Sequence, residues 1–273
     1  MSENLIYQAP HLRVKACRYG VMMYMPNDQY IGRSLDLYGE FSEDEIALFR
    51  QIVKPGATVI DVGANIGCHT VFFSQCVGVN GCVLAFEPQR PLFHILCGNI
   101  ALNRQLNVIS HQAALGRESG FLAVPQVDYT DEANFGGMSL EAPQLGERVP
   151  VLTLDSLNLT RCDFIKIDVE GMEEEVLRGA AATLTAHQPI LYVENDRREK
   201  SAPLITWLME HDYRLYWHLP PLFHADNYFD ESENVFEGIV SMNMLCIPAS
   251  SDLVAKDFQA ITSPSDAPDG VRW

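Results

Sequence analysis

Short apolar runs alternate along this chain with longer segments whose apolar residues recur at helical spacing. The central runs are rich in Val and Ile, which is typical of strands buried in a parallel sheet. Because helical segments separate them, the pattern predicts an α/β fold with a mostly parallel, seven-stranded sheet and helices on both faces. The predicted strands cover residues 59–62, 82–86, 108–114, 164–169, 189–194, 213–217 and 243–247.

The segment before this alternation has a different pattern. Residues 12–16 and 21–25 are short runs that favour β-strands, so we expect N-terminal β additions to the main sheet. Ser42 and Glu45 have the spacing of a capping box, which predicts a helix with Ser42 as its N-cap. This lead-in helix should end at the Lys-Pro-Gly of residues 54–56.

These patterns divide the chain into three parts. Residues 1–53 form an N-terminal extension with its lead-in helix, and residues 54–248 form the main domain. Within that domain, residues 116–148 carry many Gly, Pro, Asp and Asn residues and interrupt the alternation. We expect an insertion there that covers the sheet edge, as substrate lids often do. The Ser-, Asp- and Pro-rich residues 249–273 predict a poorly ordered tail.

The most informative segment is Val-Ile-Asp-Val-Gly-Ala-Asn-Ile-Gly at residues 59–67. It has the form of a buried strand that turns through Gly63 and Asn65 into a helix beginning near Gly67. A strand, a glycine turn and a helix N-terminus form a nucleotide-cofactor site in open α/β sheets. The next strand ends in Glu87, whose carboxylate can accept hydrogen bonds from both ribose hydroxyls. These features indicate a cofactor that contains adenosine.

The spacing of the glycines narrows the choice of cofactor. A dinucleotide fingerprint requires Gly-x-Gly-x-x-Gly, and Gly63-Ala64-Asn65-Ile66-Gly67 does not meet it. Asp61 would add negative charge where a pyrophosphate lies, but it suits the ammonium and sulfonium groups of S-adenosylmethionine. A purely structural glycine turn in an empty α/β domain is the alternative interpretation.

A second group of polar residues follows the fourth and fifth predicted strands. Asp168 and Glu170 lie at the end of the fourth predicted strand, and Glu194 ends the next. Ligands of open α/β sheets bind beyond the carboxyl ends of the strands, so these acids should face the same crevice as Gly63. Buried acids are unfavourable without a partner. We therefore expect at least one of them to contact the donor or the substrate.

Composition excludes several classes of partner. The 273-residue chain has a formal net charge of −17, which disfavours a nucleic acid or an anionic membrane surface as partner. Its seven cysteines form no Cys-x-x-Cys pair, so neither a zinc ribbon nor a disulfide framework is indicated. The sequence shows no signal peptide and no apolar run of the ~18 residues that a membrane span needs. A cytoplasmic location is the simplest expectation.

Three motifs together resemble the FkbM family of S-adenosylmethionine-dependent methyltransferases. They are residues 59–67, Phe-Glu-Pro at 86–88, and Ile-Lys-Ile-Asp-Val-Glu-Gly at 165–171. Residues 38–41, 113–116 and 138–140 also look like that family's pattern, and the resemblance extends from about residue 30 to 248. It implies a class I methyltransferase (Rossmann-like) fold and O-methylation of a hydroxyl on a natural product or sugar. The donor contacts that it implies are Asp61, Gly63, Asn65, Gly67, Glu87 and Asp168, with Glu40 and Ser139 as weaker transfers.

The expected reaction is an in-line displacement in which a small-molecule hydroxyl attacks the donor methyl group. The predicted catalytic residues are Asp168, Glu170 and Glu194. Burial and neighbouring acids are expected to raise the pKa of Asp168 or Glu194 enough for one of them to act as the base. A divalent cation held by all three acids is a competing, less favoured mechanism. Three other functions stay open: N-methylation, an oxidoreductase that uses an adenine dinucleotide, and a non-catalytic donor-binding module. The sequence also leaves oligomerisation open.

Overall fold

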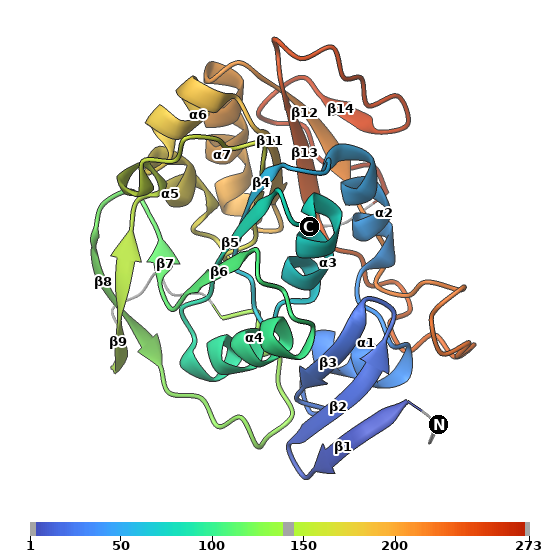
Figure 1. Cartoon of the computed structure of the whole chain (residues 1–273). Helices are drawn as coiled ribbons and strands as arrows, with labels where there is room; N and C mark the ends of the chain where they lie inside the picture. Colours follow the sequence, from blue (N-terminus) through green and yellow to red (C-terminus); the bar gives the residue numbers. More distant parts are fainter. Residues whose placement is uncertain (1–3, 139–144, 271–273) are drawn as a thin grey trace.

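The computed structural model describes residues 4–138 and 145–270, and its main feature is an eight-stranded sheet (Figure 1). Five adjacent strands are parallel, and the remaining three pair in antiparallel fashion at one end. The predicted α/β fold with a mostly parallel sheet is therefore confirmed. In spatial order the strands are β6 (Val108–His111), β5 (Cys82–Phe86), β4 (Thr58–Val62), β10 (Phe164–Ile167), β11 (Ile190–Glu194), β13 (Asn243–Pro248), β12 (Tyr213–His218) and β14 (Gln259–Ile261).

Helices cover both faces of this sheet, and the alternation of side chains along each strand decides which helices they meet. Val59 of β4 packs in one cluster with apolar residues of α2 (Glu43–Ile52) and α3 (Cys68–Val77). Ile60 faces the opposite side, in a cluster formed with α5 (Glu173–Arg178), α6 (Ala181–His187) and α7 (Arg198–Glu210). Asp61 therefore shares the α3 face with Val59.

A second, three-stranded sheet contains much of the predicted insertion. β8 (Gly120–Pro125) and β9 (Gly146–Leu152) form an antiparallel pair, and the short β7 (Ala114–Leu115) runs parallel to β9. The strand predicted at 108–114 is therefore divided between two sheets, because β6 ends at His111 and Ala114 pairs with Val151.

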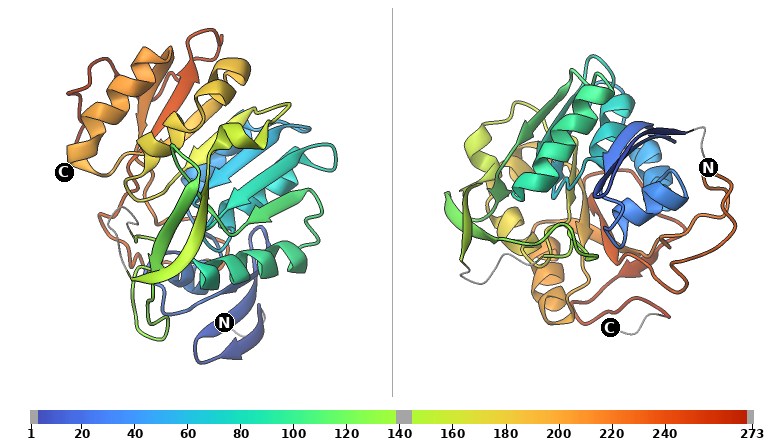
Figure 2. Two further views of the ribbon diagram at one scale, coloured as in Figure 1. Left: turned by 90° about the vertical axis from the view of Figure 1, so that its left-hand side faces the viewer. Right: turned by 90° about the horizontal axis from the view of Figure 1, so that it is seen from below.

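Both predicted N-terminal strands are present, and they form a separate sheet with a third strand that the sequence analysis did not predict. β1 (Leu5–Ala9), β2 (Leu12–Cys17) and β3 (Gly20–Tyr24) make an antiparallel meander, which α1 (Ile31–Leu37) follows. Figure 2 shows this sheet at one end of the molecule, beside α4 (Arg90–Leu102). The side-chain amide of Asn99 in α4 donates a 3.0 Å hydrogen bond to the Met23 carbonyl, which fastens the two parts together.

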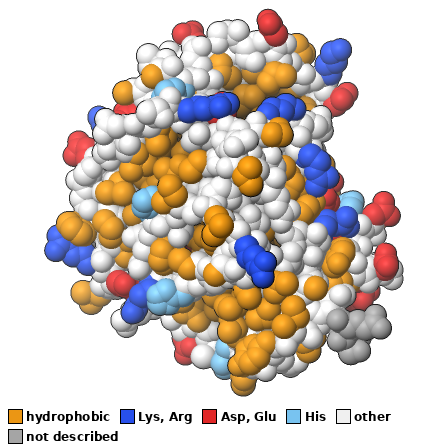
Figure 3. All heavy atoms as spheres, in the orientation of Figure 1, with side chains coloured by type: hydrophobic (Ala, Val, Ile, Leu, Met, Phe, Trp, Pro, Cys, Tyr) orange, Lys and Arg blue, Asp and Glu red, His pale blue; other side chains and the backbone are white. Residues whose placement is uncertain are grey.

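Apolar side chains gather over the N-terminal sheet on the face drawn in Figure 3. Leu5, Ile6 and Tyr7 of β1 are among the exposed apolar residues of the chain. The Lys and Arg side chains on the same face are scattered rather than clustered. Within residues 4–138 and 145–270, no helix has the length and apolar character that crossing a bilayer requires.

The structure differs from the sequence-based expectation at the tail. Residues 259–261 form β14, which pairs with β12 and adds an eighth strand to the predicted seven. Ile261 packs into the main core with 5% of its surface exposed. The polar composition of residues 249–270 concealed this strand, because only three residues form it and one of them carries the packing.

The helix predicted after Ser42 is present and ends before Lys54, but the predicted capping-box hydrogen bond from Ser42 is not formed. Ser42 is the N-cap residue of α2, but its backbone is left-handed (φ 50°) and its side chain makes no capping hydrogen bond. The main partners of Glu45 lie elsewhere. Its carboxylate is buried in the interior and lies 3.2 Å from the imidazole of His69.

Candidate functional site

The turn after β4 brings the backbone of two neighbouring strands into close contact. Gly63 has φ +78°, and a Cβ atom there would lie 1.8 Å from the carbonyl oxygen of Asp168. Gly67, at φ +90°, begins α3, and a Cβ atom there would lie 2.6 Å from Cδ1 of Leu96. Only glycine fits both positions. The turn therefore has the tight form that the sequence predicts.

Glu87 is fixed at the end of β5 by this turn. Its carboxylate accepts a 2.9 Å hydrogen bond from the backbone N–H of Asn65 and a 2.8 Å bond from that of Gln89. Burial raises the pKa of Glu87 to about 7, against the two N–H donors that lower it, and the charge of Asp168 raises it further. Each carboxylate oxygen keeps a lone pair that a ligand hydroxyl can use.

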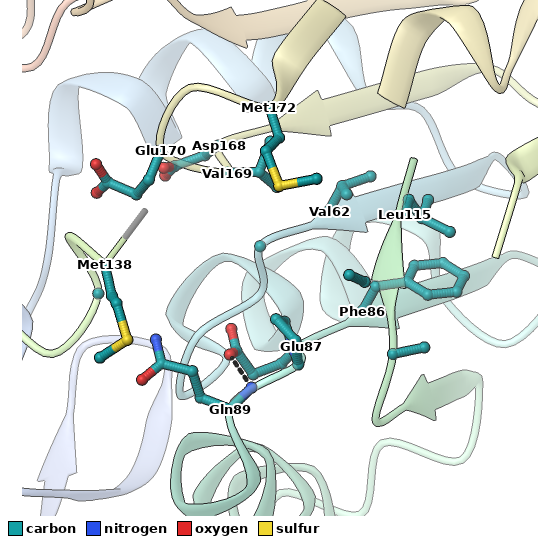
Figure 4. A pocket seen from close by; sticks show the side chains of 15 residues that line it. Val62, Phe86, Glu87, Gln89, Leu115, Met138, Asp168, Val169, Glu170 and Met172 are labelled. Carbon is teal, nitrogen blue, oxygen red and sulfur yellow. Dashed lines mark hydrogen bonds between the residues drawn. The ribbon is translucent and has the colours of Figure 1, made fainter. Parts of the chain in front are cut away.

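Two cavities meet at this turn. Figure 4 shows the first, which lies between β4, β5 and the segment after β10, with Met138 and Met172 projecting into it. The second is larger, with a volume of about 670 Å³. The residues that line both are Gly63, Glu87, Gly136, Asp168 and Glu170. The two spaces therefore share one polar border.

The three predicted catalytic acids come together in the second cavity. One carboxylate oxygen from each of Asp168, Glu170 and Glu194 lies within 4.8 Å of the others. Lys166 donates a 3.0 Å hydrogen bond to Asp168, and Arg197 forms an ion pair with Glu170. Two of the three acids thus already have a cationic partner, and this donor set of oxygen atoms is one that a divalent cation accepts.

Burial dominates the pKa values of this acidic group. It raises the pKa of Glu170 to about 7, with the charges of Asp168 and Asp196 adding to the effect. It raises the pKa of Glu194 well above the usual range for the same reasons. Glu194 therefore favours its protonated form more strongly than an exposed glutamate does.

Other predicted donor contacts line neither cavity. Asp61 is fully buried under α3, where it accepts a 2.5 Å hydrogen bond from the Thr70 hydroxyl. Gly67 also lies outside both cavity walls. Of the remaining predicted donor contacts, Gly63 and Glu87 line both cavities and Asn65 lines the second.

Glu40 has a different environment from the one expected for a donor contact. Its buried carboxylate binds Arg18 at 2.5 Å, His224 at 2.9 Å and the backbone N–H of Tyr228 at 2.9 Å. These contacts join the segment before α2 to the long loop between β12 and β13. Ser139 lies outside the described residues.

Comparison with known proteins identifies the family. The model of the methyltransferase FkbM domain matches residues 61–215, more than half of the 273-residue chain. The chain belongs to this family. Two curated fungal proteins, Methyltransferase 1 of Beauveria bassiana and Methyltransferase sdnD of Sordaria araneosa, are each 29% identical, over 143 and 154 residues. Each match covers 44% of this chain, and the chain spans 57% and 59% of the two relatives.

The chain is similar to one solved structure of an FkbM protein, methyltransferase FkbM from Methylobacillus flagellatus. The two share 17% sequence identity with a TM-score of 0.47, over 74% of this chain and 50% of that one. The order of the first seven strands, β6-β5-β4-β10-β11-β13-β12, is that of the class I methyltransferase fold, to which β14 is an addition.

The structure adds two residues that the sequence reasoning missed in this FkbM domain. Lys166 and His69 both line the second cavity and both are nearly fully buried. Lys166 interrupts an otherwise apolar strand, which is a signal that the sequence offered, since a lysine is rarely buried without partners. His69 gave a weaker signal, because it lies in an apolar helix whose N-terminus reaches the cavity.

Proposed function

We propose that this chain is an S-adenosylmethionine-dependent methyltransferase that transfers a methyl group to a hydroxyl of a small molecule. One observation carries the proposal. Glu87 and the turn at Gly63 lie at the border of both cavities, with the Glu87 carboxylate held by two backbone N–H groups. That geometry suits a ribose whose two hydroxyls donate to one carboxylate, with a base on one side and a chain on the other.

The first cavity suits the adenine end of the donor. Its walls include Phe86, Ala113 and Leu115, which give an apolar surface beside Glu87. The space itself is small, about 50 Å³, and Met138 and Met172 extend toward it from different sides (Figure 4). Methionine side chains are unbranched and adapt easily. Adenine binding would therefore move these two side chains.

The second cavity suits the amino-acid end of the donor together with an acceptor. The donor supplies an electrophilic methyl group on a positively charged sulfur. Asp168 and Glu170 place carboxylates at the cavity border, where they favour a cationic ligand. Phe41, Leu222 and Ile239 form apolar walls farther out. A volume of about 670 Å³ accommodates a small acceptor beside the donor's amino-acid chain.

Catalysis would come mainly from positioning two reactants where water is excluded. The sequence predicts that the catalytic acids are Asp168, Glu170 and Glu194, and all three line the second cavity. Asp168 accepts a hydrogen bond from Lys166 and lies at the border of both cavities, where its carboxylate suits a contact with the positively charged donor. Glu194, whose pKa is raised, suits hydrogen-bond donation to an acceptor rather than proton abstraction.

Isothermal titration calorimetry tests this function without knowledge of the acceptor. S-adenosylhomocysteine should bind with a Kd in the micromolar range, about −8 kcal/mol, and NADH should not bind. Glu87→Gln should weaken S-adenosylhomocysteine at least about tenfold, because it removes an acceptor for a ribose hydroxyl. Glu174→Gln, which alters a partly exposed ion pair with Arg178, is the matched control.

Two results would overturn the proposal: binding of NADH in place of S-adenosylhomocysteine, or no affinity for either. A mass-spectrometric screen of hydroxylated and aminated small molecules then identifies the acceptor through the mass gain of one methyl group. Amines as the only products would replace O-methylation with N-methylation.

A further inference from the structure

The second cavity contains a histidine that is paired with a buried carboxylate behind it. His69, the second residue of α3, lines the cavity with only 7% of its surface exposed. Its Nε2 atom lies 3.2 Å from Oε2 of Glu45 on α2. The ring of Phe41, which also lines the cavity, lies 5.8 Å from the imidazole.

Glu45 is held firmly in this position. Its other oxygen, Oε1, accepts a 2.9 Å hydrogen bond from the side-chain amide of Asn243 and a 3.3 Å bond from the Tyr192 hydroxyl. Burial alone would raise the pKa of Glu45, but the neighbouring His69 and Lys166 outweigh burial and lower it. The carboxylate therefore stays charged and can stabilise a positive charge on the imidazole.

This arrangement determines which ring nitrogen is available to a ligand. With Nε2 beside a carboxylate, the neutral imidazole keeps its proton on Nε2, and the lone pair lies on Nδ1. A carboxylate behind a histidine orients the ring and stabilises the imidazolium that forms when a proton is taken up. A histidine titrates near neutral pH, whereas a carboxylate without a raised pKa is a weak base.

We propose that His69, oriented by Glu45, is the general base that removes the proton from the acceptor hydroxyl. The inference rests on the proposed function and adds a residue to it. As the bond from the acceptor oxygen to the methyl carbon forms, the carbon–sulfur bond breaks and its electron pair goes to sulfur. The hydroxyl proton goes to Nδ1 of His69. The products are the methylated acceptor, neutral S-adenosylhomocysteine and an imidazolium paired with Glu45.

The cavity acids are less suitable for this step. Burial and the charges of Asp168 and Glu170 raise the pKa of Glu194, which favours its protonated form. Asp168 and Glu170 are paired with Lys166 and Arg197. The reaction needs a base that is not paired with a cation, and the charged group that His69 contacts is the carboxylate of Glu45.

Several charged and titratable groups surround the dyad and affect its protonation. They come from each element that packs against it: Glu45 of α2, Asp61 of β4, Lys166 of β10, Tyr192 of β11, and His218 of β12, which hydrogen-bonds to Tyr192. A change in the titration of His69 is therefore informative only when the protein itself is unchanged and the bound ligand alone differs in charge.

A pair of ligands provides that comparison. S-adenosylmethionine carries a positive charge on sulfur, and S-adenosylhomocysteine has a neutral sulfur in the same place. If His69 faces the reacting methyl group, the sulfonium should disfavour the imidazolium and lower the midpoint of its NMR titration by about one pH unit relative to the S-adenosylhomocysteine complex. A histidine with a purely structural role, away from the methyl group, would titrate equally in both complexes.

The experiment uses full-length protein with labelled histidine imidazoles. His69→Gln identifies the resonance by its loss, and Glu45→Gln identifies it independently by shifting its midpoint to lower pH. His187, which hydrogen-bonds to the Leu159 carbonyl away from both cavities, is the internal control and should titrate equally in the two complexes.

Equal midpoints for His69 in both complexes would overturn the inference while leaving the proposed function intact. Failure of both ligands to bind would instead remove the proposed function, and the inference with it. With an acceptor from the screen, His69→Gln should lower kcat about 100-fold and abolish the rise of kcat with pH, while its affinity for S-adenosylhomocysteine stays within about twofold.

Discussion

The carbonyl oxygen of Asp168 occupies the space that a Cβ atom on residue 63 would need, so only glycine fits at that position. A Cβ atom on Gly63 would be 1.8 Å from that oxygen, and the backbone N–H of Asp168 donates a 3.1 Å hydrogen bond to the Val62 carbonyl. The ends of β4 and β10 are thereby locked together. This contact fixes the position of the acidic segment at 168–170 relative to the turn that borders both cavities.

Replacing Gly63 with alanine should therefore destabilise the whole fold. Left-handed φ alone costs an alanine about 1 kcal/mol, and relief of the backbone overlap should bring the total loss in the free energy of unfolding to about 4 kcal/mol. Gly56→Ala is the matched control, because Gly56 has φ +81° but nothing within 4 Å of its Cβ position. Chemical denaturation measures both. Similar losses in the two variants would show that the close contact is unimportant.

Sequence reasoning succeeded where the signal was local. The apolar runs gave β4, β5, β10, β11, β12 and β13, and the glycine spacing gave the turn. It failed where a side chain's environment depends on other elements. Asp61 lies in the right strand, but pairing of β4 with β10 places it beside Lys166 under α3, not in a cavity. Glu40 meets His224 from far along the chain, and no local pattern predicts that contact.

Donor affinity should depend on pH through Glu87. Its pKa, raised to about 7 by burial, means that the carboxyl is half protonated at neutral pH. Ribose hydroxyls donate to the charged form, so the affinity for S-adenosylhomocysteine should fall as pH decreases below about 7, by up to tenfold per pH unit, and level off above about 8. Calorimetric titrations from about pH 5.5 to about pH 8.5, which bracket the pKa of Glu87, measure this dependence.

The glutamine variant shows whether Glu87 is the group responsible. Glu87→Gln should bind more weakly at high pH and lose most of the slope. Burial and neighbouring acids also raise the pKa of Glu170 to about 7, so Glu170 is another cavity residue that titrates in this pH range. If Glu170→Gln rather than Glu87→Gln removes the slope, the ribose assignment of Glu87 is wrong.

The same raised pKa has a consequence for stability without ligand. A buried carboxyl that prefers its neutral form contributes most below its unfolded pKa of about 4.5, and that contribution is lost as pH rises toward 7. Glu87→Gln should therefore reduce the decline in the free energy of unfolding over this pH range. Chemical denaturation of both proteins at about pH 5 and about pH 7.5, close to the unfolded and folded pKa values of Glu87, measures this decline. Identical declines would contradict the assignment.

Glu40 should contribute to stability and not to donor binding. Glu40→Gln removes the nearer of the two carboxylates paired with the Arg18 guanidinium, leaving Glu43, and it weakens the contact with His224. The free energy of unfolding should therefore fall by about 2 kcal/mol. Affinity for S-adenosylhomocysteine should change less than about twofold, since Glu40 lines neither cavity. A large loss of affinity with unchanged stability would restore Glu40 as the donor contact that the sequence predicts.

Divalent cations should bind weakly at the group Asp168, Glu170 and Glu194. Lys166 and Arg197 already neutralise two of the carboxylates, and burial raises the pKa of Glu194. A divalent cation must therefore compete with two side-chain cations and with protonation of Glu194. Titration with Mg²⁺ or Mn²⁺ should give a Kd no tighter than about 1 mM, and EDTA should leave S-adenosylhomocysteine affinity unchanged. Micromolar binding that Glu194→Gln abolishes would support the metal mechanism instead.

The last strand should matter despite its composition. Ile261 of β14 pairs with Leu215 of β12 and packs against the main core, with 5% of its surface exposed. Ile261→Ala should lower the free energy of unfolding by about 3 kcal/mol, because it leaves a cavity where the sheet ends. Val254→Ala, at a position 62% exposed, is the control and should have almost no effect. Equal, small effects would mean that residues 249–270 do not hold the edge of the sheet in solution.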